Sequence, residues 1–90
     1  MGTFHHDMHA LHGTTVVVDT TGPEIYVGRC YDMDDDQIIL LDADVHRDGD
    51  DGRNKAQYIE RAAQVGIWKQ FDRIVLPRSI TTTIRPLGEY

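Results

Sequence analysis

The chain has 90 residues, the length of one small domain with a single hydrophobic core. Hydrophobic residues make up 40% of it, and the longest aliphatic run, Ile38–Leu41, is much too short to cross a membrane. The net charge of −6 is unevenly divided: residues 1–52 carry twelve acids against two arginines, and residues 53–90 carry seven bases against three acids. The overall field of such a protein does not attract nucleic acid, so any contact of that kind must be local.

The single cysteine, Cys30, excludes an intramolecular disulfide and a zinc site made of cysteines alone. No basic segment followed by an apolar stretch opens the chain, which favours a cytoplasmic protein over a secreted one. A lean core without disulfides is typically supplemented by association with other chains. We therefore expect a homo-oligomer.

Three strands are expected in the first half of the chain. Thr14–Asp19 is almost entirely β-branched, and Glu24–Tyr31 alternates with apolar residues on both faces. Gly28 lies inside the second of these strands and marks a sharp bend or a close backbone approach. The polar stretch Asp34–Asp36 predicts a hairpin turn that leads into a third strand, Gln37–Val45.

A polar, glycine-rich loop over residues 46–53 precedes an amphipathic helix at about 54–65. Asp51 or Asn54 can cap the start of this helix, and Gly66 supplies the left-handed residue that ends many helices. Two further strands are expected after it, at Gln70–Leu76 and Ile80–Arg85. The predicted core consists of Val16, Val18, Ile25, Val27, Ile39, Leu41, Ile74, Leu76, Ile80 and Ile84.

Near the start of the chain, Phe4, Met8 and Leu11 recur at helical spacing and predict a short helix that stops at Gly13. Histidines on one face of such a helix can bind Zn²⁺ or Ni²⁺. The histidines with this spacing are His5, His6, His9 and His12. Terminal segments of this kind more commonly form a polar end, so we expect no metal site.

No catalytic site is expected. Asp48, Asp50 and Asp51 lack the order of a calcium-binding loop. Ser79 lacks the glycine-flanked turn of a nucleophile elbow, and Cys30 lies within a strand with no histidine near it in the sequence. We predict a protein that is not an enzyme and that has no cofactor.

Trp68 lies near Tyr58 and Phe71 and among several basic residues. An aromatic cluster of this kind either joins the helix to the sheet or stacks on nucleic-acid bases. We expect the joint, because large aromatic side chains dominate protein cores, and we keep base stacking as the alternative.

Two stretches resemble the motifs of the Sm-like family. Residues 26–34 resemble the first Sm motif, with Gly28, Cys30, Met33 and Asp34 at its glycine, apolar and aspartate positions. The run Ile38–Leu41 is similar to the third strand of the bacterial Sm-like RNA chaperone Hfq. Residues 75–84 resemble the second Sm motif in its bacterial form, in which Arg78 and Ile80 are the motif residues.

This resemblance implies a mainly β fold, a five-stranded, strongly bent Sm-like (SH3-like) barrel with a short N-terminal helix. The whole chain, 1–90, would be a single Sm-like domain with an N-terminal segment at 1–13 and a helical insertion at 46–69. Its pattern is closest to bacterial or phage Sm-like proteins with an insertion between strands 3 and 4. The family also implies a homo-oligomeric ring of about five to seven subunits, in which the fourth strand of one subunit pairs with the fifth of the next.

In family members that bind uridine-rich RNA, the residue two places after the motif aspartate stacks on a base. The resemblance puts this position on Asp36, whose carboxylate offers no stacking face. We therefore expect RNA or single-stranded nucleic acid to bind through the basic second half, on the face that carries Arg78 and the helix. The candidate residues are Arg53, Lys55, Arg61, Lys69, Arg73 and Arg78. The alternative, favoured by the acidic first half, is a scaffold or protein-interaction ring with no nucleic-acid role.

Overall fold

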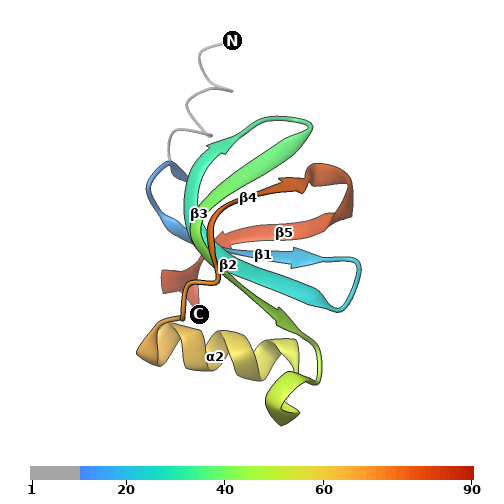
Figure 1. The fold of residues 1–90 in the computed structure, drawn as a ribbon, viewed down its shortest axis with the longest axis vertical. Helices are drawn as coiled ribbons and strands as arrows, with labels where there is room; N and C mark the ends of the chain where they lie inside the picture. The colour runs from blue at the N-terminus through green and yellow to red at the C-terminus, as the bar shows by residue number, and fades with distance from the viewer. Residues whose placement is uncertain (1–10) are drawn as a thin grey trace.

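The computed structural model describes residues 11–90. These residues form one antiparallel five-stranded sheet in the order β4-β3-β2-β1-β5, bent into a small barrel with a helix across one end (Figure 1). The strands are β1 (Thr15–Thr20), β2 (Glu24–Met33), β3 (Gln37–Arg47), β4 (Phe71–Pro77) and β5 (Thr81–Pro86), and the helix is α2 (Lys55–Val65). Single turns of 3-10 helix follow β3, β4 and β5: η1 (Asp50–Gly52), η2 (Arg78–Ile80) and η3 (Leu87–Glu89).

The predicted mainly β fold with five strands and a helix between the third and fourth strands is confirmed. β3 continues to Arg47, two residues beyond its expected end, so the following loop is shorter than expected. The short helix expected from Phe4 and Met8 lies outside the described residues, as do His5, His6 and His9. No helix within residues 11–90 is long and apolar enough to span a membrane.

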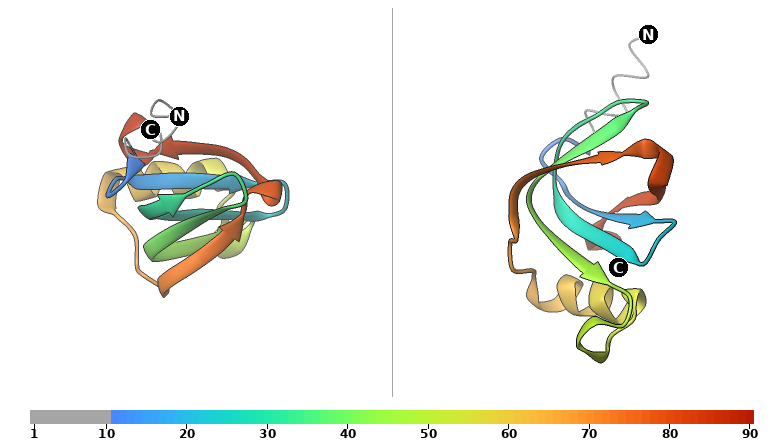
Figure 2. Two further views of the ribbon diagram at one scale, coloured as in Figure 1. Left: turned by 90° about the horizontal axis from the view of Figure 1, so that it is seen from above. Right: turned by 45° about the vertical axis from the view of Figure 1, so that its right-hand side comes forward.

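The bend in the sheet is centred on Gly28, where β2 lies close against its antiparallel neighbour β3. A Cβ atom at this position would lie 2.8 Å from the Cβ of Ala43 and 3.1 Å from that of Leu40. The pairing of β2 with β3 shifts register between Val27 and Arg29, and Asp42 on the opposite strand adopts a left-handed backbone with φ of 51°. A glycine therefore lets the two strands approach closely while the sheet curls around the core (Figure 2).

The core has two parts. The barrel interior is filled by Val16, Val18, Cys30, Ile38, Leu40, Ala43 and Leu76. A second cluster, Val17, Ile25, Val27 and Ile59, lies between the sheet and α2. Burial also raises the pKa of the Cys30 thiol, with a smaller contribution from the charge of Asp32, so this cysteine is held in its neutral form.

Six of the ten predicted core residues are buried, and four are not. Val16, Val18, Ile25, Val27, Ile39 and Leu76 are confirmed. Leu41, Ile74 and Ile84 are only half-buried, and Ile80 is 38% exposed. Leu41 adjoins the left-handed Asp42 at the bend, whereas Ile74 and Ile84 lie on the two edge strands, which have a neighbouring strand on one side only. Ile80 belongs to η2 and not to a strand.

The start of α2 is stabilised by a capping box. The side chain of Asn54 accepts a hydrogen bond from the backbone N–H of Gln57, and the Gln57 side chain accepts one from the backbone N–H of Asn54. Gly66 ends the helix, and Ile59 and Ala62 are its buried residues. Of the two residues expected to cap the helix, Asn54 is confirmed. Asp51 is not the cap, because it lies in η1, where its φ is positive. The helix thus covers the sheet at the end of the barrel away from the β2–β3 turn (Figure 1).

Candidate nucleic-acid interface

The six basic residues expected to bind nucleic acid do not lie on one face. Arg53 and Arg61 line a cavity beside α2, and Lys69 and Arg73 lie at the start of β4. Arg78 follows β4 at its other end and contacts the β2–β3 turn. The expectation that Arg78 and the helix share a face is therefore wrong. β4 begins beside the helix and runs away from it, so its last residues and η2 lie far from α2 (Figure 1).

The side chain of Lys55 is bound to other groups of the same chain. Its ammonium group lies 2.7 Å from the carboxylate of Asp19 and donates to the carbonyl oxygens of Gly22 at 2.7 Å and Thr20 at 3.2 Å. An ammonium group has three donors, and all three are used here. Lys55 therefore connects the start of α2 to the β1–β2 turn, and no donor is left for a phosphate.

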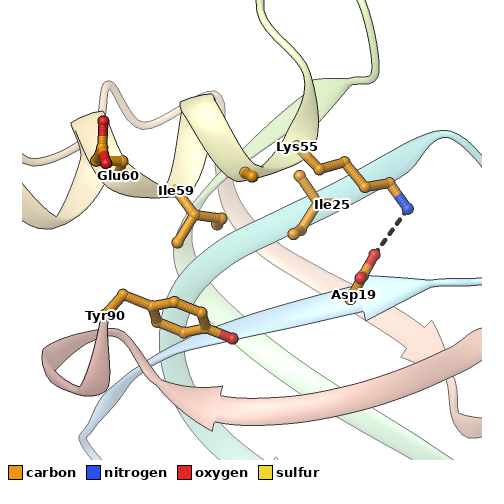
Figure 3. A pocket seen from close by; sticks show the side chains of 7 residues that line it. Asp19, Ile25, Lys55, Ile59, Glu60 and Tyr90 are labelled. Atoms are coloured by element: carbon orange, nitrogen blue, oxygen red, sulfur yellow. Dashed lines mark hydrogen bonds and ion pairs between the residues drawn. The ribbon is translucent and has the colours of Figure 1, made fainter.

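The pair of Lys55 and Asp19 also borders a cavity of about 440 Å³. Figure 3 shows this pair at one side, with Ile25 and Ile59 between it and Tyr90. Because the charged groups of the pair are bound to each other and to the backbone, the cavity presents mainly apolar surface. It does not have the chemistry of a nucleic-acid site.

Lys69 is also paired with acids. Its ammonium group lies 2.8 Å from Asp72 and 3.7 Å from Asp42, and Asp42 accepts a hydrogen bond from Arg29 at 3.1 Å. The hydrogen bond and the charge of Asp72 raise the pKa of Lys69, and the same contact lowers the pKa of Asp72. This exposed network leaves Lys69 with little free charge to offer an anion.

The β2–β3 turn is organised by Asp34. Its carboxylate accepts hydrogen bonds from the backbone N–H groups of Asp36 at 2.8 Å and Gln37 at 2.9 Å, which is the geometry of an Asx turn. The guanidinium of Arg78 donates to the carbonyl of Asp34 at 2.8 Å, and the Arg78 backbone N–H donates to the carbonyl of Asp36 at 2.8 Å. The β4–β5 connection is therefore fastened to the turn. We name Asp34–Gln37 together with Arg78–Ile80 the loop face.

Arg78 is the cation of the loop face. Its guanidinium is bound to a neutral carbonyl and forms no ion pair with any carboxylate of residues 11–90. A guanidinium has five N–H donors, so most of its capacity remains free. It lines a cavity of about 330 Å³ with Leu11, Met33 and residues 81–84, three of which are threonines. The cavity thus combines a positive charge, hydroxyl groups and an apolar wall.

Four of the motif residues, Gly28, Asp34, Arg78 and Ile80, contribute to this end of the molecule or to its bend. Gly28 allows β2 and β3 to approach closely, Asp34 forms the turn, and Arg78 joins the two loops. Ile80 accepts a hydrogen bond from the backbone N–H of Thr21 through its carbonyl at 2.9 Å and so anchors η2. Asp36, at the expected stacking position, is exposed and supplies no aromatic surface.

An aromatic pair near the loop face was not predicted. Tyr31 on β2 is about half exposed, and its ring centroid lies 5.9 Å from that of His12. Tyr31 lies two residues before Met33, and Met33 lines the cavity at Arg78. The alternation of side chains along β2 could have indicated that Tyr31 is exposed. Cys30 points into the core, so the next residue, Tyr31, must point outward.

Trp68 does not join the helix to the sheet. Its side chain is 89% exposed, and Tyr58 packs against the core beneath α2 instead. The prediction that Trp68 packs between the helix and the sheet is therefore wrong. Trp68 lies in the short connection between Gly66 and β4 and is largely exposed.

No family model and no curated protein sequence matches this chain. Among solved structures, it is similar to the Sm protein of Pyrococcus abyssii in complex with a uridine heptamer. The match has a TM-score of 0.62 at 18% identity, and it covers 90% of this chain and 93% of that chain. The chain has an Sm-like fold. The fold expected from the two motif-like stretches is thus confirmed.

Proposed function

We propose that this protein is a non-enzymatic Sm-like protein that forms a homo-oligomeric ring and binds single-stranded RNA at the loop face. The observation that carries the proposal is the placement of Arg78. Two hydrogen bonds to the β2–β3 turn hold it beside a cavity of about 330 Å³, while most of its donors stay free. The similar Sm protein of Pyrococcus abyssii, which is in complex with a uridine heptamer, supports RNA as the ligand.

The loop face supplies some of the contacts that a single strand needs. The guanidinium of Arg78 can donate to phosphate or base oxygens, and the hydroxyl groups of Thr82 and Thr83 can both donate and accept. The Thr81 hydroxyl donates to the carbonyl of Arg78 at 2.9 Å and can only accept from a ligand. The three aspartates of the turn oppose phosphate, and Asp36 cannot stack. We therefore expect binding that is weaker than in a site with an aromatic residue at this position.

The two edges of the sheet support the ring. Neither β4 nor β5 has a second neighbouring strand within the described chain, and exposed edges tend to pair with other chains. Pairing β4 of one copy with β5 of the next uses two different edges, which is a head-to-tail contact that closes into a ring when the rotation permits.

The second candidate function is a scaffold or protein-interaction ring without nucleic acid. It is supported by the acidic turn at Asp34–Asp36 beside Arg78 and by the negative first half of the chain. The two candidates share the fold and the ring and differ only in whether RNA binds the loop face.

Fluorescence anisotropy with a labelled uridine heptamer and a mixed-sequence RNA, at low salt, distinguishes the two candidates. We expect wild-type protein to bind and Arg78→Ala to bind more weakly. If Arg78 contacts one phosphate, its loss should reduce the slope of log affinity against log salt by about 0.7. Arg47→Ala is the matched control, since Arg47 is an exposed arginine paired with Glu24 away from the loop face.

A companion variant, Asp36→Tyr, should bind the uridine heptamer more tightly. It removes a repulsive charge and adds a stacking surface, which is worth ~1–3 kcal/mol per base. If a folded, oligomeric wild-type protein binds neither RNA at low salt, RNA binding at the loop face is rejected and the scaffold function is favoured.

A further inference from the structure

A second cavity, of about 280 Å³, lies between β3, α2 and the connection from Gly66 to β4. We name it the helix-side cavity. The side chains that matter for its chemistry are Asp44, Arg53, Tyr58, Arg61, Trp68 and Gln70. Its volume is at the low end of ligand pockets, which suits one small ligand and not an extended chain.

The floor of the helix-side cavity is a buried carboxylate without a cation. Asp44 is 8% exposed, and no Lys or Arg of the described chain lies within ion-pair distance of it. Its oxygens accept one hydrogen bond from the Tyr58 hydroxyl at 2.7 Å and one from the Gln70 side-chain amide. Each carboxylate oxygen can accept two hydrogen bonds, so half of the capacity of Asp44 remains unused.

The neighbours of Asp44 leave this capacity open. Burial, the hydrogen bond to Asp44 and its negative charge raise the pKa of Tyr58, which keeps its proton and can only donate to Asp44. The amide nitrogen of Gln70 also donates to the carbonyl of Val45, so its remaining polar atom is the acceptor Oε1. A buried charge with two neutral partners is incompletely compensated. Both oxygens of Asp44 have one partner each, and the floor of the cavity can accept further N–H donors from a ligand.

Two arginines at the rim of the helix-side cavity are positively charged donors, in contrast to the negatively charged acceptors of Asp44. Arg53 and Arg61 line the cavity, and neither forms an ion pair within residues 11–90. Asp50 and Asp51 line the rim as well, so an anion would be held by direct guanidinium contacts and not by a positive field. The backbone of Arg53 is fixed, because its carbonyl accepts a hydrogen bond from Nε2 of His46 at 2.9 Å.

Besides Asp44 and the two arginines, the helix-side cavity has the indole of Trp68, which lines it and is 89% exposed. A large exposed aromatic ring beside arginines is a platform for a planar ligand. Acceptors at the floor, guanidinium groups at the rim and an indole face together match a ligand that has an N–H-rich planar ring and an anionic group.

We propose that the helix-side cavity binds a guanine nucleotide. The Watson–Crick edge of guanine presents two adjacent N–H donors, which a carboxylate can accept side by side, whereas the same edges of adenine and uracil each present one donor group. Asp44 accepts these donors, Trp68 stacks on the base, and Arg53 and Arg61 bind the phosphate. The nucleotide is either free or part of an RNA strand. This site lies on the helix side of the barrel and does not depend on the loop face.

Trp68 is the only tryptophan of the chain, so its fluorescence reports directly on this cavity. We expect GMP to quench it saturably and with at least tenfold higher affinity than AMP, UMP or ribose 5-phosphate. N-acetyltryptophanamide is the control for light absorbed by the nucleotides. Asp44→Asn should lower the affinity for GMP about tenfold, which lies within the range that one bidentate base contact contributes.

Arg61→Ala tests the rim without touching the core, since Arg61 is exposed on α2. It should weaken GMP binding, whereas Arg73→Ala, an exposed arginine outside the cavity, should leave it unchanged. Two RNAs test whether the ligand is a free nucleotide or part of an RNA strand: a uridine heptamer that contains one guanosine, and the plain uridine heptamer. Binding of GMP alone shows a free nucleotide, and binding of only the guanosine-containing strand shows a nucleotide of RNA.

The proposal is overturned if neither GMP nor the guanosine-containing strand quenches Trp68 at millimolar concentration. It is also overturned if Arg61→Ala and Asp44→Asn, both shown to be folded, bind GMP as wild type does. Loss of uridine heptamer binding in Arg78→Ala reports only on the loop face, so the two sites fail or succeed separately.

Discussion

At the scale of single residues, Gly28 shows most clearly how the sequence produces the fold. Its φ is not in the left-handed region, so the reason for a glycine is space and not backbone freedom. The atoms that a side chain would meet belong to Ala43 and Leu40, and one of them is the Ala43 Cα at 3.1 Å, which cannot move away as a flexible side chain can. The close approach of β2 to β3 at the bend therefore depends on this position.

Gly28→Ala should lower the free energy of unfolding by about 1–3 kcal/mol, the usual range for forcing an extra methyl group into a packed core. Urea denaturation followed by circular dichroism measures the change. Gly88→Ala is the matched control, because nothing lies within 4 Å of its added Cβ and its φ is not positive. Equal stability of the two variants would show that the contact between β2 and β3 can relax at no cost.

Residue identity predicted Gly28 and the aspartate turn, but not the surroundings of Trp68 or Arg78. A tryptophan near a helix normally packs in a core, and only the path of the chain between Gly66 and β4 leaves this one exposed. Likewise, Arg78 was recognised as a motif residue, yet its distance from the helix follows from the direction of β4. Such placements are long-range properties, which a local pattern does not contain.

At the scale of elements, α2 was predicted nearly to the residue because its signals are local. Asn54 and Gln57 form the capping box, and Gly66 ends the helix. The strand β3 shows the opposite case, since Ile38, Ile39 and Leu40 are all buried and the run has no alternation. An uninterrupted aliphatic run identifies a buried strand but not which side chains point inward, and the predicted inward residues Ile39 and Leu41 missed Ile38 and Leu40.

Asn54→Ala should destabilise the protein by about 1 kcal/mol, because it leaves the backbone N–H of Gln57 without its acceptor. Thermal unfolding measures this loss. Gln64→Ala, at an exposed position of the same helix, is the control and should change stability little. A cap variant as stable as wild type would mean that packing of Ile59 and Ala62 alone sets the helix boundary.

At the scale of the whole molecule, the described chain leaves hydrogen-bonding groups along two sheet edges. β4 and β5 end the strand order, and Val75 on β4 is 46% exposed. A small barrel with a lean core gains most from covering such an edge, both by strand pairing and by burial of its apolar side chains. The charge pattern acts at the same scale, because in the proposed ring the net negative charge of each copy would oppose that pairing.

Light scattering at micromolar concentration should therefore report an assembly of several 10.2 kDa chains and not a monomer. Val75→Lys should shift this assembly toward the monomer, since a lysine on an edge strand places a charge in the strand pairing and recurs at every contact of a ring. Gln64→Lys adds the same charge on the exposed face of α2 and should leave the assembly intact. Because a head-to-tail ring repeats one contact, a modest cost at Val75 acts at every interface, and the loss of assembly should be cooperative. A wild-type protein that is monomeric and folded would instead show that the bent barrel shields its own edges.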